Sequence, residues 1–131
     1  MEGKLISGAT TRCWVFTGKP EYVDSHVAPA TALEGGYLVV LSLTDGSVRL
    51  AATRYPARYL NTWQGNARRF GIADVDLVLV SSPLLRYEAV KRSLARQLAN
   101  YQVDGKEGFW IGLNALNEAA QRLFDAAGLS R

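Results

Sequence analysis

The sequence is poor in the residues that most often carry catalysis or cross-link a chain. Its 131 residues include one cysteine, Cys13, and one histidine, His26. A single cysteine excludes a disulfide within the chain, which favours a reducing, cytoplasmic location. Cys13 lies in an apolar run with no histidine beside it, so we expect a buried small hydrophobic residue rather than a nucleophile. The lone histidine lies in a polar stretch rich in proline and alanine, and we expect it in an exposed loop.

Long apolar segments are also missing. The apolar, uncharged stretch over residues 35–44 is much shorter than the about 20 residues needed to span a bilayer. No basic segment followed by an apolar run opens the sequence, so we expect no signal peptide and no membrane partner. Hydrophobic residues make up 48% of the chain, which is enough to fill the core of one compact domain.

Acidic residues are scarce in the middle of the chain. Residues 49–96 contain three acids (Asp74, Asp76 and Glu88) and nine basic residues, while the whole chain carries a net charge of +3. Most of these basic residues are arginines, whose planar guanidinium suits bidentate contact with phosphate groups or base edges. The pattern predicts a phosphate-binding surface, although the solvated faces of ordinary amphipathic helices would give the same composition.

The hydrophobic periodicity predicts an α/β (α+β) fold, with a small central sheet led by an antiparallel hairpin and flanked by three helices. The hairpin is expected over residues 37–43 and 47–53, because Asp45-Gly46 is a strong turn signal. Further strands are expected at 74–81 and 108–112. The three helices are expected from Pro56 to Gly71, over 85–100, and from a cap at Asn114 to Gly128. Residues 1–34 are expected to form an N-terminal arm with one short strand at 13–17, and residues 35–131 the domain.

The same spacing predicts which side chains are buried. On the second hairpin strand, Arg49 alternates with Val48 and Leu50 and is expected to face away from the core. Trp14, Trp63 and Trp110 are expected in the core, although Trp110 could stack on a nucleic-acid base if it faced outward. The stripes expected to be buried on the three helices are Ala57, Leu60, Trp63, Ala67 and Phe70; Tyr87, Val90, Leu94, Leu98 and Tyr101; and Leu116, Ala119, Ala120, Leu123, Phe124 and Ala127.

Several short motifs occur in an order that resembles the GIY-YIG nuclease family, in the branch common in phage and plasmid proteins. They are Gly36-Tyr37-Leu38-Val39-Val40-Leu41, then Val48-Arg49-Leu50-Ala51-Ala52-Thr53, then Pro56-Ala57-Arg58-Tyr59-Leu60, and finally the helix over 87–101 with the acidic-aromatic segment 107–111. Each motif is loose, and the resemblance rests on their order and spacing over about three fifths of the chain.

The positions where the family keeps its chemistry hold other residues here. In the family, a tyrosine and a metal-binding glutamate bracket the scissile phosphate, and an arginine stabilises the transition state. In this chain a valine stands at the tyrosine position and a lysine at the glutamate position. Valine cannot orient water, and a protonated lysine has no lone pair for a metal. The family's arginine position aligns best with Tyr59, and Arg58 lies one residue before it. The aligned tyrosine, glutamate, histidine and signature glycine positions are Val39, Lys91, Ala95 and Ala51.

The resemblance therefore implies a DNA-binding domain of a mobile element, without catalytic residues, metal or cofactor. Two alternatives stay open: an active metal-dependent endonuclease that uses Glu88 as a displaced ligand, and a protein-interaction module. In the favoured interpretation, Arg49, Arg58, Lys91 and Arg92 converge on one cleft, and Arg122 and Arg131 lie elsewhere. The residues predicted to contact DNA are Arg49, Arg54, Arg58, Arg68, Arg69, Lys91, Arg92 and Arg96.

Overall fold

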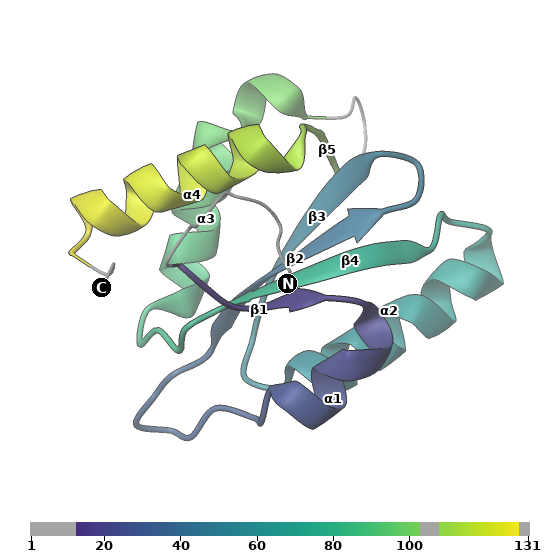
Figure 1. The fold of residues 1–131 in the computed structure, drawn as a ribbon, viewed down its shortest axis with the longest axis horizontal. Helices are drawn as coiled ribbons and strands as arrows, with labels where there is room; N and C mark the ends of the chain where they lie inside the picture. The colour runs from purple at the N-terminus through teal and green to yellow at the C-terminus, as the bar shows by residue number, and fades with distance from the viewer. Residues whose placement is uncertain (1–12, 103–107, 129–131) are drawn as a thin grey trace.

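A computed structural model of the chain describes residues 13–102 and 108–128. The parts of the predictions that concern residues 1–12, the turn at 104–106, Glu107 and Arg131 lie outside the described residues. Figure 1 shows the elements in chain order. They are β1 (Trp14–Gly18), a 3-10 turn (Pro20–Tyr22), α1 (Val23–His26), β2 (Tyr37–Leu43), β3 (Ser47–Thr53), α2 (Pro56–Phe70), β4 (Val75–Ser81), α3 (Tyr87–Gln97), a second 3-10 turn (Ala99–Tyr101), β5 (Phe109–Trp110) and α4 (Leu113–Ala126).

The strands form one antiparallel sheet in the order β1-β4-β2-β3-β5. The predicted hairpin is confirmed: β2 and β3 pair from Tyr37–Thr53 to Ser42–Val48. Gly46 adopts a φ of 91° in its turn, a conformation that favours glycine. The predicted N-terminal strand is also present, because β1 pairs with β4 at the edge of the sheet.

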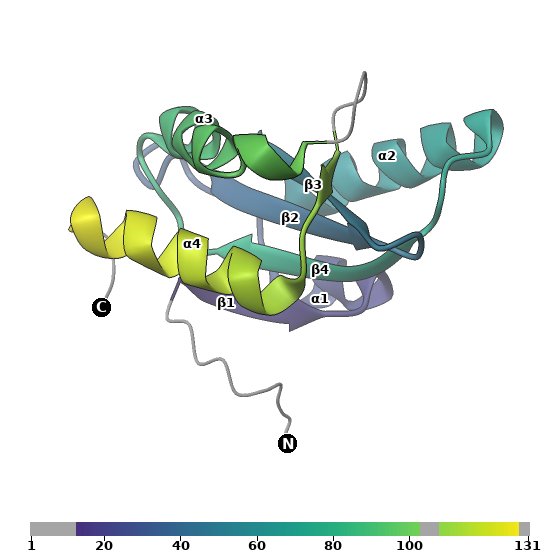
Figure 2. The same cartoon turned by 90° about the horizontal axis from the view of Figure 1, so that it is seen from above.

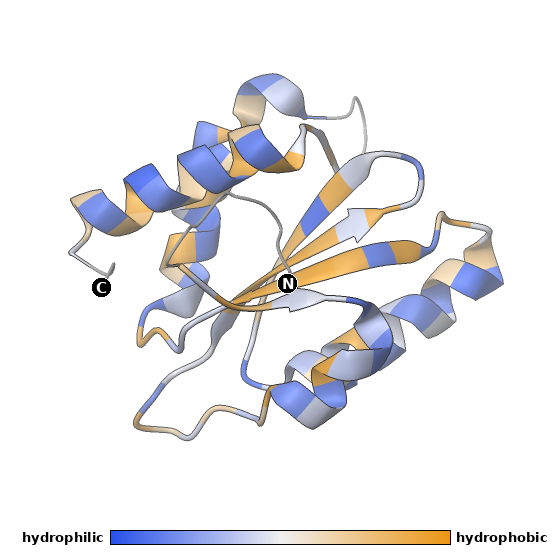
Figure 3. Cartoon of the chain, viewed as in Figure 1, coloured by the Kyte–Doolittle hydropathy of each residue, from blue (hydrophilic) through white to orange (hydrophobic). Residues whose placement is uncertain are grey.

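Helices cover both faces of this sheet, which confirms the predicted α+β class. Figures 1 and 2 show α3 and α4 on one face and α1 and α2 on the other. The short helix α1 was not predicted, and exposed His26 lies in it rather than in a loop. Two hydrophobic clusters result, and in Figure 3 the strands between them are predominantly hydrophobic.

The first core cluster joins the sheet to α3 and α4. Its strand residues include Leu38, Val40 and Val48, which pack with Leu94 of α3 and Phe124 of α4. Cys13 belongs to this cluster and is fully buried, as predicted. Successive residues of a strand point to opposite faces, so the neighbouring residues of the same strands belong to the other cluster.

The second core cluster joins the sheet to α1 and α2. Val39 and Leu41 of β2 and Ala51 of β3 pack with Leu60 of α2. Val23 at the start of α1 is also buried here, with Val27 and Ala30 after the helix. The segment between the first strand and the hairpin therefore contributes to the core. The division at residues 34 and 35 stays a prediction.

Several buried positions were predicted wrongly. Phe70, at the last residue of α2, has 70% of its surface exposed, and Tyr101 has 43%. Trp110 is 50% exposed because Phe109 occupies the core side of β5. The cap at Asn114 is also wrong, since the N-cap of α4 is Gly112 and the helix begins at Leu113. Ala127 lies beyond the last turn of α4 and is exposed.

Candidate nucleic-acid interface

An acid-free segment builds β3 and α2. Residues 47–73 contain five arginines and no aspartate or glutamate, so this segment carries a larger positive charge than the whole chain. Pro56 starts α2 at a position where its missing N–H costs nothing. Gly71 ends α2, as the sequence predicted; it adopts the left-handed conformation, with a φ of 69°, and its N–H donates a hydrogen bond to the Ala67 carbonyl.

Two arginines are held against a tyrosine where α2 begins. The guanidinium carbon of Arg58 lies 4.6 Å from the centre of the Tyr55 ring, and that of Arg54 lies 5.5 Å from it. Arg54 also donates a hydrogen bond of 3.3 Å from Nη2 to the carbonyl oxygen of Ala30. Stacking on an aromatic face restricts an arginine without neutralising it. Both charges are therefore partly oriented before any ligand arrives.

The three α2 residues that were predicted to contact DNA lie on its exposed surface. Arg58, Arg68 and Arg69 are all exposed. Three to four residues make one helical turn, so Arg58 and Arg69, eleven residues apart, share nearly the same outward direction. The exposed residues between Arg58 and Arg68 are uncharged and can form hydrogen bonds or allow close approach: Asn61, Thr62, Gly65 and Asn66. The outward face of α2 thus has positive charge without a competing carboxylate of its own.

Arg49 occupies the space between β5 and α2. Its guanidinium lies 5.8 Å from the centre of the Trp63 ring. On its other side, a Cβ added to Gly108 would come within 3.0 Å of the Arg49 Nε, so a glycine makes room for this side chain. The Arg49 Nε is buried and has no hydrogen-bond partner among the residues that the structure describes. Arg49 does alternate with Val48 and Leu50, but it does not face away from the core, because its face carries the second core cluster.

The hairpin turn places one carboxylate near Arg49. Asp45 Oδ1 accepts hydrogen bonds from the hydroxyl and the backbone N–H of Ser47, at 2.7 and 2.9 Å. The hydroxyl bond is the main reason that the pKa of Asp45 is lowered, and the backbone bond and the charge of Arg49 lower it further. Asp45 is therefore ionised at neutral pH and offsets part of the Arg49 charge.

The structure does not bring the predicted cations into one cleft. Lys91, Arg92 and Arg96 are on α3, which packs on the first core cluster, whereas α2 packs on the second. Both helices lie beside β3, but on opposite faces of the sheet (Figure 2). Lys91 is half-buried, and Arg92 and Arg96 are exposed. The expectation of a single cleft is wrong because a buried stripe on a helix does not reveal which face of the sheet it covers.

The family's catalytic positions are mostly inside the protein. Val39 and Ala51 belong to the second core cluster, with 1% and 3% of their surfaces exposed, and Ala95 packs against the first. Glu88 is exposed on α3. Within residues 13–102 and 108–128, no three side chains of histidine, cysteine, aspartate or glutamate gather as metal ligands.

Trp110, which was expected in the core, is exposed beside the hairpin. Trp110 pairs with Ser47, and its ring lies 3.8 Å from a Cβ built on Gly46. Strand alternation places it on the same face as Arg49. The signal that could have found it is the alternation Gly108-Phe109-Trp110, in which only Phe109 is needed for the core.

No family model, curated protein or solved structure matches this chain. None of the helices in the described part of the chain combines the length and the hydrophobicity of a membrane-spanning segment.

Proposed function

We propose that this protein is a cytoplasmic DNA-binding protein without nuclease activity, built on a GIY-YIG-like scaffold and serving a phage or plasmid. The observation that carries the proposal is the acid-free segment over residues 47–73, whose arginines lie along β3 and the outward face of α2. Phosphate contacts supply most of the affinity of non-specific DNA binding. A helix surface that carries several cations and no carboxylate is suited to such phosphate contacts.

The order of elements supports the scaffold in this proposal. The hairpin of β2 and β3, the helix α2, the strand β4 and the helix α3 follow one another as the resemblance implies. The absence of catalysis is inferred from the residues at the family's catalytic positions. Val39 is buried where a tyrosine would have to reach the phosphate, and Lys91 replaces the metal-binding carboxylate.

The outward face of α2 is the proposed contact surface. Arg58, Arg68 and Arg69 would contact phosphates, and Arg54 would support the beginning of the helix. Arg49 is half-buried and would act at the edge, near exposed Trp110. Lys91, Arg92 and Arg96, which were also predicted to contact DNA, are not part of this surface, because α3 covers the other face of the sheet.

The first test is the salt dependence of binding. We expect an affinity for duplex DNA that falls steeply with salt, because each neutralised phosphate releases counterions. Four to six contacts correspond to a slope of roughly −4 to −5 in a plot of log K against log salt. Fluorescence anisotropy of a labelled duplex between 50 and 200 mM salt, about the range over which such binding changes most, would measure it. A flat response, or no binding at low salt, would instead support the protein-interaction alternative.

The second test is cleavage. We expect no nicking of supercoiled plasmid with magnesium or manganese, because the aligned tyrosine and glutamate positions hold Val39 and Lys91. Gel electrophoresis of plasmid incubated with the purified chain would measure it, with Glu88→Ala and Glu118→Ala variants beside the wild type. Nicking that Glu88→Ala abolishes and Glu118→Ala preserves would establish the endonuclease alternative.

A further inference from the structure

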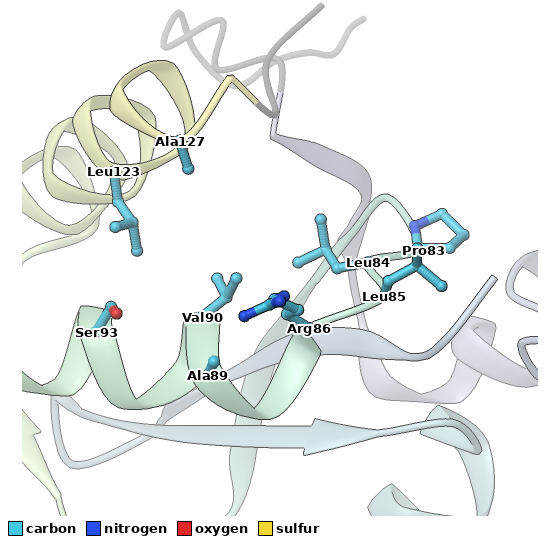
Figure 4. Close-up of a pocket in the computed structure, with 9 residues that line it drawn as sticks. All are labelled: Pro83, Leu84, Leu85, Arg86, Ala89, Val90, Ser93, Leu123 and Ala127. Carbon is cyan, nitrogen blue, oxygen red and sulfur yellow. The ribbon is translucent and has the colours of Figure 1, made fainter.

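An apolar pocket lies between α3, the end of α4 and the loop after β4. Its volume is about 520 Å³, which is within the range of small-molecule sites. Figure 4 shows Val90 and Ala89 of α3, Leu123 of α4, Ala127 directly after α4, and Pro83 and Leu84 of the loop around it. This pocket is on the α4 side of α3 and does not include any residue of α2.

Tight backbone contacts hold the loop wall of the pocket in place. Leu84 and Gly36 form two backbone hydrogen bonds. The Leu84 N–H donates to the Gly36 carbonyl oxygen at 2.7 Å, and the Gly36 N–H donates to the Leu84 carbonyl oxygen at 3.0 Å. Gly36 lies against the ring of Tyr87, which a Cβ at this position would approach to 2.7 Å. The wall is therefore formed in the free protein, which lowers the entropic cost of binding.

One charged residue lines this apolar pocket. Arg86 is the N-cap of α3, and its guanidinium lies in the space beside Val90 and Leu84 (Figure 4). It has no ion pair with the residues that the structure describes. The beginning of α3 has no side-chain cap, so the positive end of the helix dipole adds to the Arg86 charge. Glu88 is the one acid in the first turn, and it does not line the pocket.

We propose that this pocket binds a small amphiphilic carboxylate, such as a medium-chain fatty acid. The apolar walls from Pro83, Val90 and Leu123 would bury the chain of the ligand. The carboxylate would form a bidentate ion pair with Arg86, whose fork geometry matches it. Leu85 has 73% of its surface exposed at the pocket and would be covered by the ligand. This site is independent of the proposed DNA surface, since the two occupy different faces of the sheet.

The probe for this proposal is decanoate, used below the concentration at which it forms micelles. We expect saturable binding to the 131-residue chain in a titration followed by amide NMR shifts, with the largest shifts near Leu85 and Ala127. Arg86→Gln should weaken decanoate binding about tenfold or more, because a charge-assisted hydrogen bond is lost. The same variant should leave the affinity for decan-1-ol unchanged.

Two further variants make the experiment decisive. Ala127→Trp, at an exposed position beyond the last turn of α4, should fill the pocket and weaken both probes. Arg92→Gln, on exposed α3 surface outside the pocket, is the control for charge alone and should change neither affinity. Equal decanoate affinity in wild type and Arg86→Gln, or in wild type and Ala127→Trp, would overturn the proposal. So would an absence of saturable shifts in the wild type.

Discussion

Gly35→Ala is expected to destabilise the protein by about 3 kcal/mol or more. Gly35 has a φ of 94°, in the region that side chains other than glycine rarely adopt. A Cβ there would collide with the Leu84 carbonyl oxygen and come within 2.7 Å of the Leu85 Cα. Both obstacles are backbone atoms, which cannot rotate away as a flexible side chain can. The loop that carries Leu84 would have to move, with its hydrogen bonds to Gly36.

The matched control is Gly65→Ala, which we expect to stabilise the protein by about 0.5–1 kcal/mol. Gly65 is exposed in the middle of α2, and a Cβ there meets no atom within 4 Å. Alanine has less conformational freedom to lose than glycine when the helix forms. The two substitutions add the same methyl group, so only the local environment explains opposite signs.

Urea unfolding followed by circular dichroism would measure both changes. A two-state fit gives the free energy of unfolding, provided that the slope against urea is the same in the three proteins. Gly35→Ala should also lower the melting temperature by about 10 °C. If Gly35→Ala unfolds at the wild-type midpoint, the close packing of residues 35 and 36 against the loop after β4 is wrong.

The second large effect concerns DNA affinity. The double variant Arg58→Glu/Arg69→Glu is expected to weaken duplex binding about 100-fold at roughly 0.1 M salt. Each lost phosphate contact removes close to a factor of ten through counterion release at that salt, and each new carboxylate adds repulsion. Both side chains are exposed on the outward face of α2, so the substitutions should leave the fold intact.

Two charge-matched controls separate a defined surface from general basicity. Arg92→Glu/Arg96→Glu makes the same charge change on α3, and we expect a loss of about threefold or less, since that helix covers the other face of the sheet. Arg122→Glu, on exposed α4, tests a single reversal far from the proposed surface. Anisotropy titrations at one fixed salt concentration would compare them. Equal losses in the two double variants would leave only non-specific electrostatics, or would extend the contact surface to α3.

The local structure could be read from the sequence where one short signal decides it. Asp45-Gly46 between two apolar runs determined the hairpin, because few other turns let strands of that twist meet. Pro56 and Gly71 determined the limits of α2, because proline tolerates the first turn and glycine the left-handed end. Burial of Cys13, Leu94 and Leu98 also followed from the apolar pattern.

Tertiary structure decided which face each element covers and where the packing ends. Phe70 has helical spacing with Trp63 and Ala67, but it is the last residue of α2, where it is largely exposed. Arg49 alternates with Val48 and Leu50, as predicted. Its face of the sheet was expected to be exposed to solvent, but α2 covers this face and forms the second core cluster with it. The cations of α2 and α3 were expected together and lie on opposite faces. Periodicity records that a side is buried, and only the path of the chain in space determines what buries it.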